Sequence, residues 1–256
     1  MLYRRAPDTV LCDTDILDFF SETAPCGVIG SFLLDKTDCR CDRFAFKHHY
    51  ITGTMDSEIL CLLFSAMQEK RMVTLETAPR NRTYIAESNV VPIRVMMSVQ
   101  NGRQYLMAYS SRFRRIAPIR LNNIISVKAG EVCGEFDALR QQLDAMQPHM
   151  WGVSTQSLSG ERMEQVTFTV HYADNESYIH QRLEREKRCG TVERLDAQTS
   201  RFSAEVFDAS ELIPWMRTFL CRIVEFHFSN PLMQKRFAAD IDEMYRIYSI
   251  AEEEQP

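Results

Sequence analysis

The sequence predicts an α+β protein in which a small antiparallel β-barrel, or a strongly bent sheet, precedes a second unit with the element order βαββαβ. Three observations lead to this prediction. The chain has 256 residues, 45% of them hydrophobic and 25% charged, as in ordinary globular proteins. Five short runs rich in β-branched and aromatic residues lie between positions 71 and 132 without an intervening helix. Strand and helix patterns alternate from position 165 onward.

The first part, residues 1–70, is expected to be a helical and linker segment. An acidic start and apolar spacing predict a short helix at DTDILDFFSET. The clearest helical pattern of the chain is DSEILCLLFSAMQEKRM, in which Ile59, Leu63 and neighbouring apolar residues form one stripe. We expect this helix to end in Lys70 and Arg71, because positive charges suit the C-terminal end of a helix dipole.

Residues 71–132 are expected to form the barrel or bent sheet. The expected strands are VTLET, NVVPIRVMMSV, RQYLMAYS, RIAPIRL and IISVKAG. Asn101-Gly102, between the second and third of these runs, is the strongest hairpin signal in the sequence. Short strands that follow one another in this way favour a small antiparallel architecture.

A helix and a linker, residues 133–164, separate the two parts of the chain. The helix is FDALRQQLDAM, Pro148 ends it, and the polar run TQSLSGERMEQ follows. Residues 165–250 then show the βαββαβ order of a ferredoxin-like domain and close with the helix PLMQKRFAADIDEMYRIYSI. An acidic tail, residues 251–256, ends the chain.

The closing helix has a broad apolar face. Its members are Leu232, Phe237, Ile241, Met244, Tyr245 and Tyr248. Because this face is larger than one small sheet needs, we expect the chain to form a two-fold homodimer through it. The alternative is that the helix only covers its own sheet.

Charge is distributed unevenly along the chain. The net charge is −5, which alone argues against a protein covered in nucleic acid. However, the 43 residues between Glu87 and Glu131 contain no Asp or Glu and have a net charge of +7. The basic residues of this acid-free segment are Arg94, Arg103, Arg112, Arg114, Arg115, Arg120 and Lys128. A basic module in an acidic protein indicates an anionic partner.

The densest part of the acid-free segment is SSRFRRIAPIR. Guanidinium groups bind phosphate oxygens in a bidentate manner, and aromatic rings offer stacking surfaces for bases. The candidate ligand-binding residues are Tyr105, Tyr109, Arg112, Phe113, Arg114, Arg115 and Arg120. If residues 112–116 are extended, Arg112 and Arg114 share one face, and Phe113 and Arg115 share the other. The alternative is a solvated edge strand whose arginines discourage strand pairing.

The sequence contains none of the common catalytic motifs. The sequence has no nucleophile elbow, phosphate-binding loop, HExxH motif or Gly-rich dinucleotide turn, so we expect no enzymatic activity and no cofactor. Cys39 and Cys41, near His48 and His49, lack the second ligand pair of a structural zinc site, so we expect no metal. The sequence contains neither an apolar run long enough to span a membrane nor a secretory signal. Scattered cysteines are typical of reduced thiols, and we expect a cytoplasmic protein.

The segment GRQYLMAYSSRFRRIAPIRLNNIISV resembles the core of the WYL domain, which occurs in bacterial transcriptional regulators. The family pattern is roughly W-Y-L-x-A-Y, a loop, and then F-R-L-D-R-I. The residues that match the first motif are Tyr105, Leu106, Ala108 and Tyr109, and Gln104 replaces the tryptophan. In the second motif Arg120 and Leu121 are kept, while Asn122 and Asn123 replace the Asp-Arg pair.

The resemblance extends over most of the chain. PCGVIGSFLLDK and FAFKHHYITGTMDSEILCLLFSAMQEKRMVTL resemble the segment that precedes the barrel in WYL regulators, and the region from Val166 resembles their C-terminal WCX extension. The resemblance implies an Sm-like (SH3-type) small barrel. It also implies the ligand-sensing and dimerisation portion of a regulator that lacks the usual N-terminal winged helix-turn-helix domain. Contact with duplex DNA would then need that missing domain.

We expect the ligand to be single-stranded nucleic acid or a nucleotide-like anion. Arg115 and Arg120 would pair with phosphate, Tyr105 would shape the pocket floor, and Phe113 or Tyr109 would stack a base. Binding would change how the two domains are arranged and so act on an attached DNA-binding domain. Two alternatives stay open: a stand-alone RNA-binding accessory protein, and a small-molecule enzyme that uses the cleft between the domains.

Overall fold

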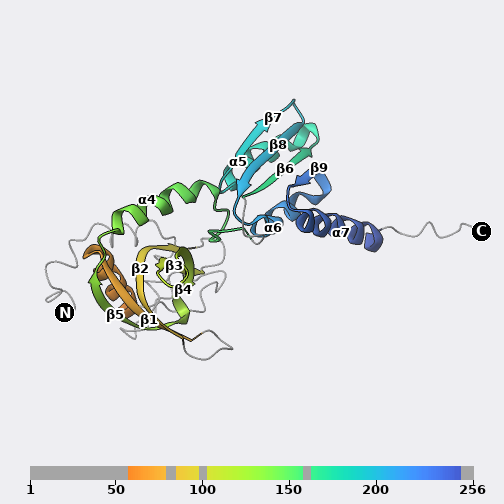
Figure 1. Cartoon of the computed structure of the whole chain (residues 1–256). Coiled ribbons are helices and arrows are strands. Elements are labelled where there is room, and N and C mark those ends of the chain that lie inside the picture. The colour runs from red at the N-terminus through yellow and green to blue at the C-terminus, as the bar shows by residue number, and fades with distance from the viewer. Residues whose placement is uncertain (1–56, 79–84, 98–102, 158–162, 249–256) are drawn as a thin grey trace, which may run out of the picture. The chain divides into compact units, whose positions relative to one another are not determined.

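The computed structural model describes residues 57–78, 85–97, 103–157 and 163–248. The chain divides into two compact units, Met1–Arg140 and Gln141–Pro256, and each combines helices with an antiparallel sheet (Figure 1). The fold is therefore α+β, as the sequence predicts. None of the described helices is long and apolar enough to cross a membrane. The expected first helix, the Cys39 and Cys41 pair and the Asn101-Gly102 turn lie outside the described residues.

In the N-terminal unit, α3 (Ser57–Gln68) precedes a five-stranded antiparallel sheet. The strands are β1 (Arg71–Thr77), β2 (Ile85–Met97), β3 (Gln104–Ser110), β4 (Arg115–Arg120) and β5 (Ile124–Val132). Each of them corresponds to one of the expected strands. Their order in the sheet is β4-β3-β2-β1-β5, and the 3-10 turn η1 (Leu121–Asn123) links β4 to β5.

The sheet of the N-terminal unit is bent, and no closed barrel is found. Within the described residues, β4 pairs only with β3, and β5 pairs only with β1. Strand β2 curves visibly in Figure 1, and its register with β3 shifts between Pro92 and Arg94. An extra residue at such a shift bends a strand and increases its twist. Of the two architectures expected from the sequence, the bent sheet is the one observed.

Helix α3 covers one face of this sheet. Leu63 is fully buried, and Ile59, Leu60 and Ala66 are buried beside it, because apolar side chains recur at helical spacing. The strand and turn residues of the same cluster are Val73, Leu75, Val90, Leu106, Ala108, Leu121, Ile124 and Val127. This cluster is the core that holds β3 in place beneath the helix.

Helix α3 ends earlier than expected. Its last residue is Gln68, Lys70 has a positive φ of 53°, and Arg71 already belongs to β1. The strand begins here because Arg71 pairs with Val132, and the Lys70 carbonyl accepts a 2.7 Å hydrogen bond from the amide of Cys133. The basic pair therefore starts the sheet and does not end the helix.

The C-terminal unit has a four-stranded antiparallel sheet in the order β7-β8-β6-β9. Its strands are β6 (Glu164–His171), β7 (Thr191–Arg194), β8 (Thr199–Val206) and β9 (Ile223–Phe228). Its helices are α5 (Tyr178–Glu186), α6 (Ile213–Met216) and α7 (Pro231–Tyr248), and the two units are linked through α4 (Phe136–Met146). The order βαββαβ is as expected. The second helix is only a short α6, followed by the 3-10 segment η5 (Arg217–Arg222).

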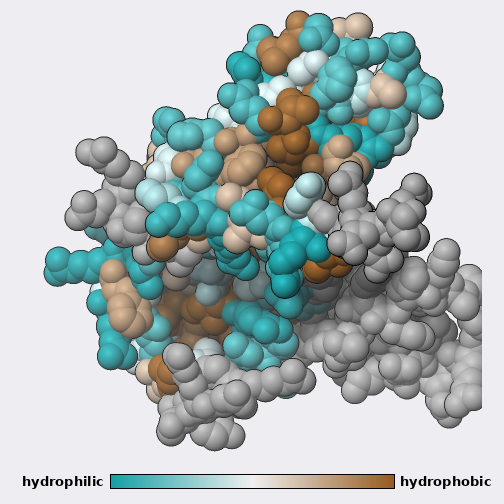
Figure 2. Space-filling model, turned by 90° about the vertical axis from the view of Figure 1, so that its right-hand side faces the viewer, coloured by the Kyte–Doolittle hydropathy of each residue, from teal (hydrophilic) through white to brown (hydrophobic). Residues whose placement is uncertain are grey.

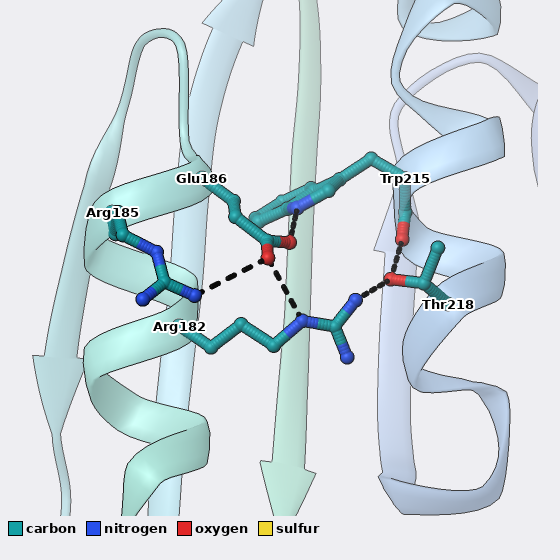
Figure 3. A network of polar contacts seen from close by, with 5 residues as sticks. All are labelled: Arg182, Arg185, Glu186, Trp215 and Thr218. Atoms are coloured by element: carbon teal, nitrogen blue, oxygen red, sulfur yellow. Dashed lines mark hydrogen bonds and ion pairs between the residues drawn. The ribbon is translucent and has the colours of Figure 1, made fainter. Parts of the chain in front are cut away.

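Side chains of α5, α6 and η5 form a polar network above the aromatic core of the C-terminal unit (Figure 3). Trp215 donates its indole N–H to Glu186 at 3.1 Å, and Arg182 Nε donates to the other carboxylate oxygen at 3.0 Å. Arg182 also donates to the Thr218 hydroxyl at 2.9 Å. Because the indole ring packs in the core, this network gives its polar N–H a partner and joins the helices.

The segment that leads into the C-terminal unit is fastened to it by Glu211. The Glu211 carboxylate accepts hydrogen bonds from the amides of Gly152, Val153 and Ser154 at 2.9, 3.1 and 3.3 Å. The preceding residue, Trp151, is buried in the aromatic core. Successive amides that share one anion form a nest, occupied here by the protein's own carboxylate.

Helix α7 is anchored by its first half. Phe237 is fully buried, and the centre of its ring lies 4.9 Å from the centre of the Phe226 ring. Tyr245 and Tyr248 continue the same side of the helix at 3.6 residues per turn, yet both are 76% exposed. Leu232, which we expected on this face, points away from it and is 71% exposed. Figure 2 shows hydrophobic residues that reach the surface of the C-terminal unit among mostly hydrophilic neighbours.

Candidate functional site

Two candidate residues of the acid-free segment face each other across neighbouring strands. Tyr105 of β3 lies directly opposite Arg120 of β4 in the antiparallel register. Arg120 is exposed at the end of β4, whereas Tyr105 is half-buried. Within the part of the chain that the structure describes, Arg120 forms no ion pair. An exposed guanidinium beside a phenol ring is suited to bind an anion.

The residues of β3 alternate between the two faces of the sheet. Leu106 and Ala108 belong to the core cluster beneath α3, so Tyr105, Met107 and Tyr109 belong to the opposite face. Arg120 shares this opposite face, because it is the register partner of Tyr105. The structure therefore places both tyrosines and Arg120 on one side of the sheet.

Residues 111–114 form a turn. Ser110 pairs with Arg115, so the residues between them must reverse the chain. Arg114 ends the reversal with a positive φ of 51°. The expected face alternation along residues 112–116 is therefore wrong, because pairing of the flanking strands bends this stretch into a hairpin.

The turn carries an exposed aromatic ring with two guanidinium groups beside it. Phe113 is 57% exposed. Arg112 Cζ lies 5.3 Å from the centre of its ring, and Arg115 Cζ lies 5.7 Å from it, both within the range of cation–π contacts. Arg112 and Arg114 are exposed and form no ion pair with any described residue. Positive charge and an accessible ring thus coincide at one place.

Side chains at the base of the turn hold it in shape. Ser110 Oγ accepts a 3.2 Å hydrogen bond from the amide of Phe113 and donates one to Glu87. Ser111 Oγ donates to the carbonyl of Asn89 at 2.6 Å. Sequence reasoning missed these bracing residues. The available signal was the Ser-Ser pair at the end of the strand, because serine hydroxyls commonly bond to the backbone in turns.

The candidate residues form two groups and do not share one pocket. Arg115, with the turn, lies at one end of β4, and Arg120 lies at the other. The strand has no register shift, so these side chains leave opposite faces, with Cα atoms about 16 Å apart. Between the two groups, Met107 and Ile116 are almost fully buried. One phosphate therefore cannot contact both arginines.

A serine–histidine pair in the C-terminal unit is not an accessible site. Ser200 Oγ lies 3.0 Å from His180 Nδ1 and 2.9 Å from the Tyr172 hydroxyl. Ser200 is fully buried, so a substrate cannot reach it. Among the described residues, no group of three or more His, Cys, Asp or Glu is placed to hold a metal ion.

Comparison with known proteins finds structural likenesses only. No protein-family profile and no curated protein sequence matches the chain. Proteasome accessory factor B/C (PafBC) of Arthrobacter aurescens is similar over 84% of this chain and 30% of its own, with 14% identity and a TM-score of 0.34. A structure described as a CRISPR Cas-related protein is similar over 75% of this chain and 53% of its own, with 7% identity and a TM-score of 0.39. The chain thus spans about half or less of either protein, and likenesses this weak assign no function.

Proposed function

We propose that the chain is the ligand-sensing and dimerisation portion of a WYL-type bacterial transcriptional regulator. The observation that carries this proposal is the pairing of Tyr105 with Arg120. These residues come from the two separate motifs that resemble the WYL core, and they lie within the acid-free segment. Two motifs that are apart in the sequence are thus adjacent in the sheet, as a shared ligand site requires.

We infer an Sm-like fold for the N-terminal unit and a ferredoxin-like fold for the C-terminal unit. The sheet order β4-β3-β2-β1-β5, with a 3-10 turn between β4 and β5, supports the first inference. The sheet order β7-β8-β6-β9, with the element order βαββαβ, supports the second. The C-terminal unit would then correspond to the WCX extension.

The ligand would be an anion, either single-stranded nucleic acid or a nucleotide. Arg120 supplies an exposed charge, and the surrounding acid-free segment supplies a local charge of +7 on a chain of net charge −5. The local positive potential of this segment attracts polyanions although the net charge of the chain is negative. We propose a cytoplasmic location and a role in binding and not in catalysis.

Binding would act on gene expression through the arrangement of the two units in a homodimer. The exposed tyrosines Tyr245 and Tyr248 extend the buried stripe of α7 and offer an apolar surface to a second copy. A two-fold dimer suits a regulator that reads palindromic sites through an attached duplex-binding domain. The ligand would change the equilibrium between two arrangements of this assembly.

The test is oligonucleotide binding by two arginine variants. Arg120→Ala should weaken binding of a labelled single strand by about 10- to 150-fold, the cost of losing a charge-assisted contact. Arg94→Ala, in β2 of the same sheet, should weaken it far less. Titration at several salt concentrations should give a log–log slope near −3, because about four phosphate contacts each contribute about −0.7.

Equal losses for Arg120→Ala and Arg94→Ala would contradict a defined site and indicate a diffuse electrostatic surface. Absence of binding by the parent chain would contradict a nucleic-acid ligand and favour a small anionic metabolite. Nucleic acid that copurifies with the chain, and that nuclease treatment removes, would give independent support.

A further inference from the structure

The turn between β3 and β4 lies about 16 Å along the strand from Arg120 and carries its own set of binding groups. We propose that this turn is a second contact for single-stranded nucleic acid, in which a base stacks on Phe113 while Arg112 and Arg114 bind phosphates. The inference rests on the proposed function and deepens it. A ligand that reaches both Arg120 and the turn must be a strand of several nucleotides, not a single nucleotide.

The first support is the combination of exposure and charge. A single exposed hydrophobic side chain needs no explanation by itself. Phe113, however, is 57% exposed with guanidinium carbons 5.3 and 5.7 Å from its ring centre. Aromatic rings bind unpaired bases through their faces, and adjacent arginines bind the phosphates between bases.

The second support is that the turn is organised before any ligand binds. Ser110 and Ser111 brace it through hydrogen bonds to Phe113, Glu87 and the Asn89 carbonyl. A turn with fixed backbone geometry loses less conformational entropy on binding than a loose loop does. The hydrogen bonds therefore hold the backbone that carries the exposed Phe113 ring.

The third support is the backbone conformation of Arg114. Its φ of 51° lies in the left-handed region, where a residue with a Cβ is strained and glycine is not. The chain thus has a long cationic side chain at a position where glycine would be easier to accommodate. Strain of this kind is frequent at binding sites.

The exposed ring of Phe113 within the acid-free segment favours nucleic acid over an acidic peptide as the ligand. Both ligands would be attracted by the acid-free segment, but every nucleotide carries a flat base that can stack on Phe113, whereas the Asp and Glu residues of an acidic peptide carry no ring. Met107 and Ile116 are buried between the turn and Arg120, so the strand would contact two separate places and not one continuous groove.

The experiment compares five variants with the parent chain, Arg120→Ala among them, using a labelled oligothymidylate of about 12 nucleotides and the mononucleotide dTMP. Phe113→Leu keeps an apolar side chain but removes the ring, and Phe113→Trp keeps a stacking surface. Arg114→Gly removes the charge and also relieves the backbone strain, so misfolding cannot explain its effect. Lys70→Gly is the matched control, because it also removes one positive charge at a positive φ in the same unit.

Phe113→Leu should weaken oligothymidylate binding by about 5- to 150-fold, and Arg114→Gly by about 10-fold, while Phe113→Trp binds as well as the parent. Lys70→Gly should leave affinity within about twofold, since its exposed ion pair contributes little. Neither turn variant should alter dTMP binding, which Arg120→Ala should weaken.

Parental affinity of Phe113→Leu and Arg114→Gly would overturn the turn contact. If Arg120→Ala still weakened binding in that case, the proposed function would survive without the inference. Equal affinities of the Leu and Trp variants, with displacement of the oligonucleotide by polyglutamate, would overturn stacking and indicate a general polyanion surface. Absence of binding of both probes by the parent would overturn the inference and the proposed function together.

Discussion

Tyr105 and Arg120 are register partners in adjacent antiparallel strands, and both side chains belong to the face of the sheet that α3 does not cover. Side chains directly opposite each other in such a pair have Cβ atoms about 5 Å apart. A ligand that contacts one of them is therefore within reach of the other. Their contributions to binding should be coupled.

A double-mutant cycle tests this coupling. Tyr105→Leu and Arg120→Ala should show an interaction energy of about 0.5–3 kcal/mol in oligonucleotide binding measured by fluorescence anisotropy. Tyr109→Leu is the matched control, because Tyr109 lies on the same face of β3 but pairs with Ile116. The cycle of Tyr109 with Arg120 should be additive within about 0.5 kcal/mol. The same coupling in both cycles would argue against a local site.

Loss of the Glu211 carboxylate should destabilise the C-terminal unit. Glu211→Ala leaves the amides of Gly152, Val153 and Ser154 without their acceptor, so we expect the free energy of unfolding to fall by about 1–2 kcal/mol. Glu205→Ala, at an exposed position of β8, should change it by less than about 0.5 kcal/mol. Urea unfolding followed by tryptophan fluorescence measures both, since the chain's two tryptophans pack together in this unit. Equal unfolding midpoints for the two variants would refute the role of Glu211.

Cys189 should react slowly with alkylating agents. Burial raises the pKa of its thiol to about 11 although the Arg188 charge opposes the shift, so very little thiolate is present near neutral pH. At about pH 8, mass spectrometry after iodoacetamide treatment should show modification of exposed Cys221 well before that of Cys189. Comparable rates in the folded protein would contradict the burial of Cys189.

The same pKa shift makes stability depend on alkaline pH. The folded-state pKa lies above the ordinary value of 9.0, so the contribution of Cys189 is complete below about pH 9 and is lost as the pH rises toward about 11. Cys189→Ala should therefore lose less stability than the parent between these two pH values, as measured by urea unfolding. A parallel decline in both proteins would show that other groups cause the loss.

The exposed end of α7 should mediate self-association. Tyr245→Asp combined with Tyr248→Asp should convert a dimer into a monomer, because the substitutions place charges on the apolar stripe. Leu232→Asp, on another side of the same helix and similarly exposed, should leave the dimer intact. Size-exclusion chromatography with light scattering distinguishes these states. A monomeric parent chain at high micromolar concentration would rule out this interface.

Local periodicity predicted the main helices and strands of the part of the chain that the structure describes. The apolar stripe that includes Ile59 and Leu63 predicted α3, β-branched and aromatic runs predicted the strands of the five-stranded sheet, and alternating strand and helix patterns predicted the order of the C-terminal unit. These signals depend on neighbouring residues, so the sequence alone carries them. Tyr105 and Arg120 were also candidates from the sequence, through the two motifs and the absence of acidic residues, but their pairing comes from the strand register. The sequence also predicted a barrel, but the described strands form an open sheet with β4 and β5 at its edges, because closure depends on the pairing of two edge strands, which no local pattern determines.

Only the tertiary structure decided which of these residues act together. Pairing of Ser110 with Arg115 bends the intervening stretch into a turn that exposes Phe113, and the extended strand β4 places Arg115 and Arg120 at its two ends. The Glu211 carboxylate accepts a hydrogen bond from the amide of Gly152, 59 positions away in the chain, and no sequence motif predicts this contact. The physical reason is the same in both cases. Sequence determines the local periodicity of each element, whereas strand register and long-range hydrogen bonds are selected by the free energy of the whole packed unit.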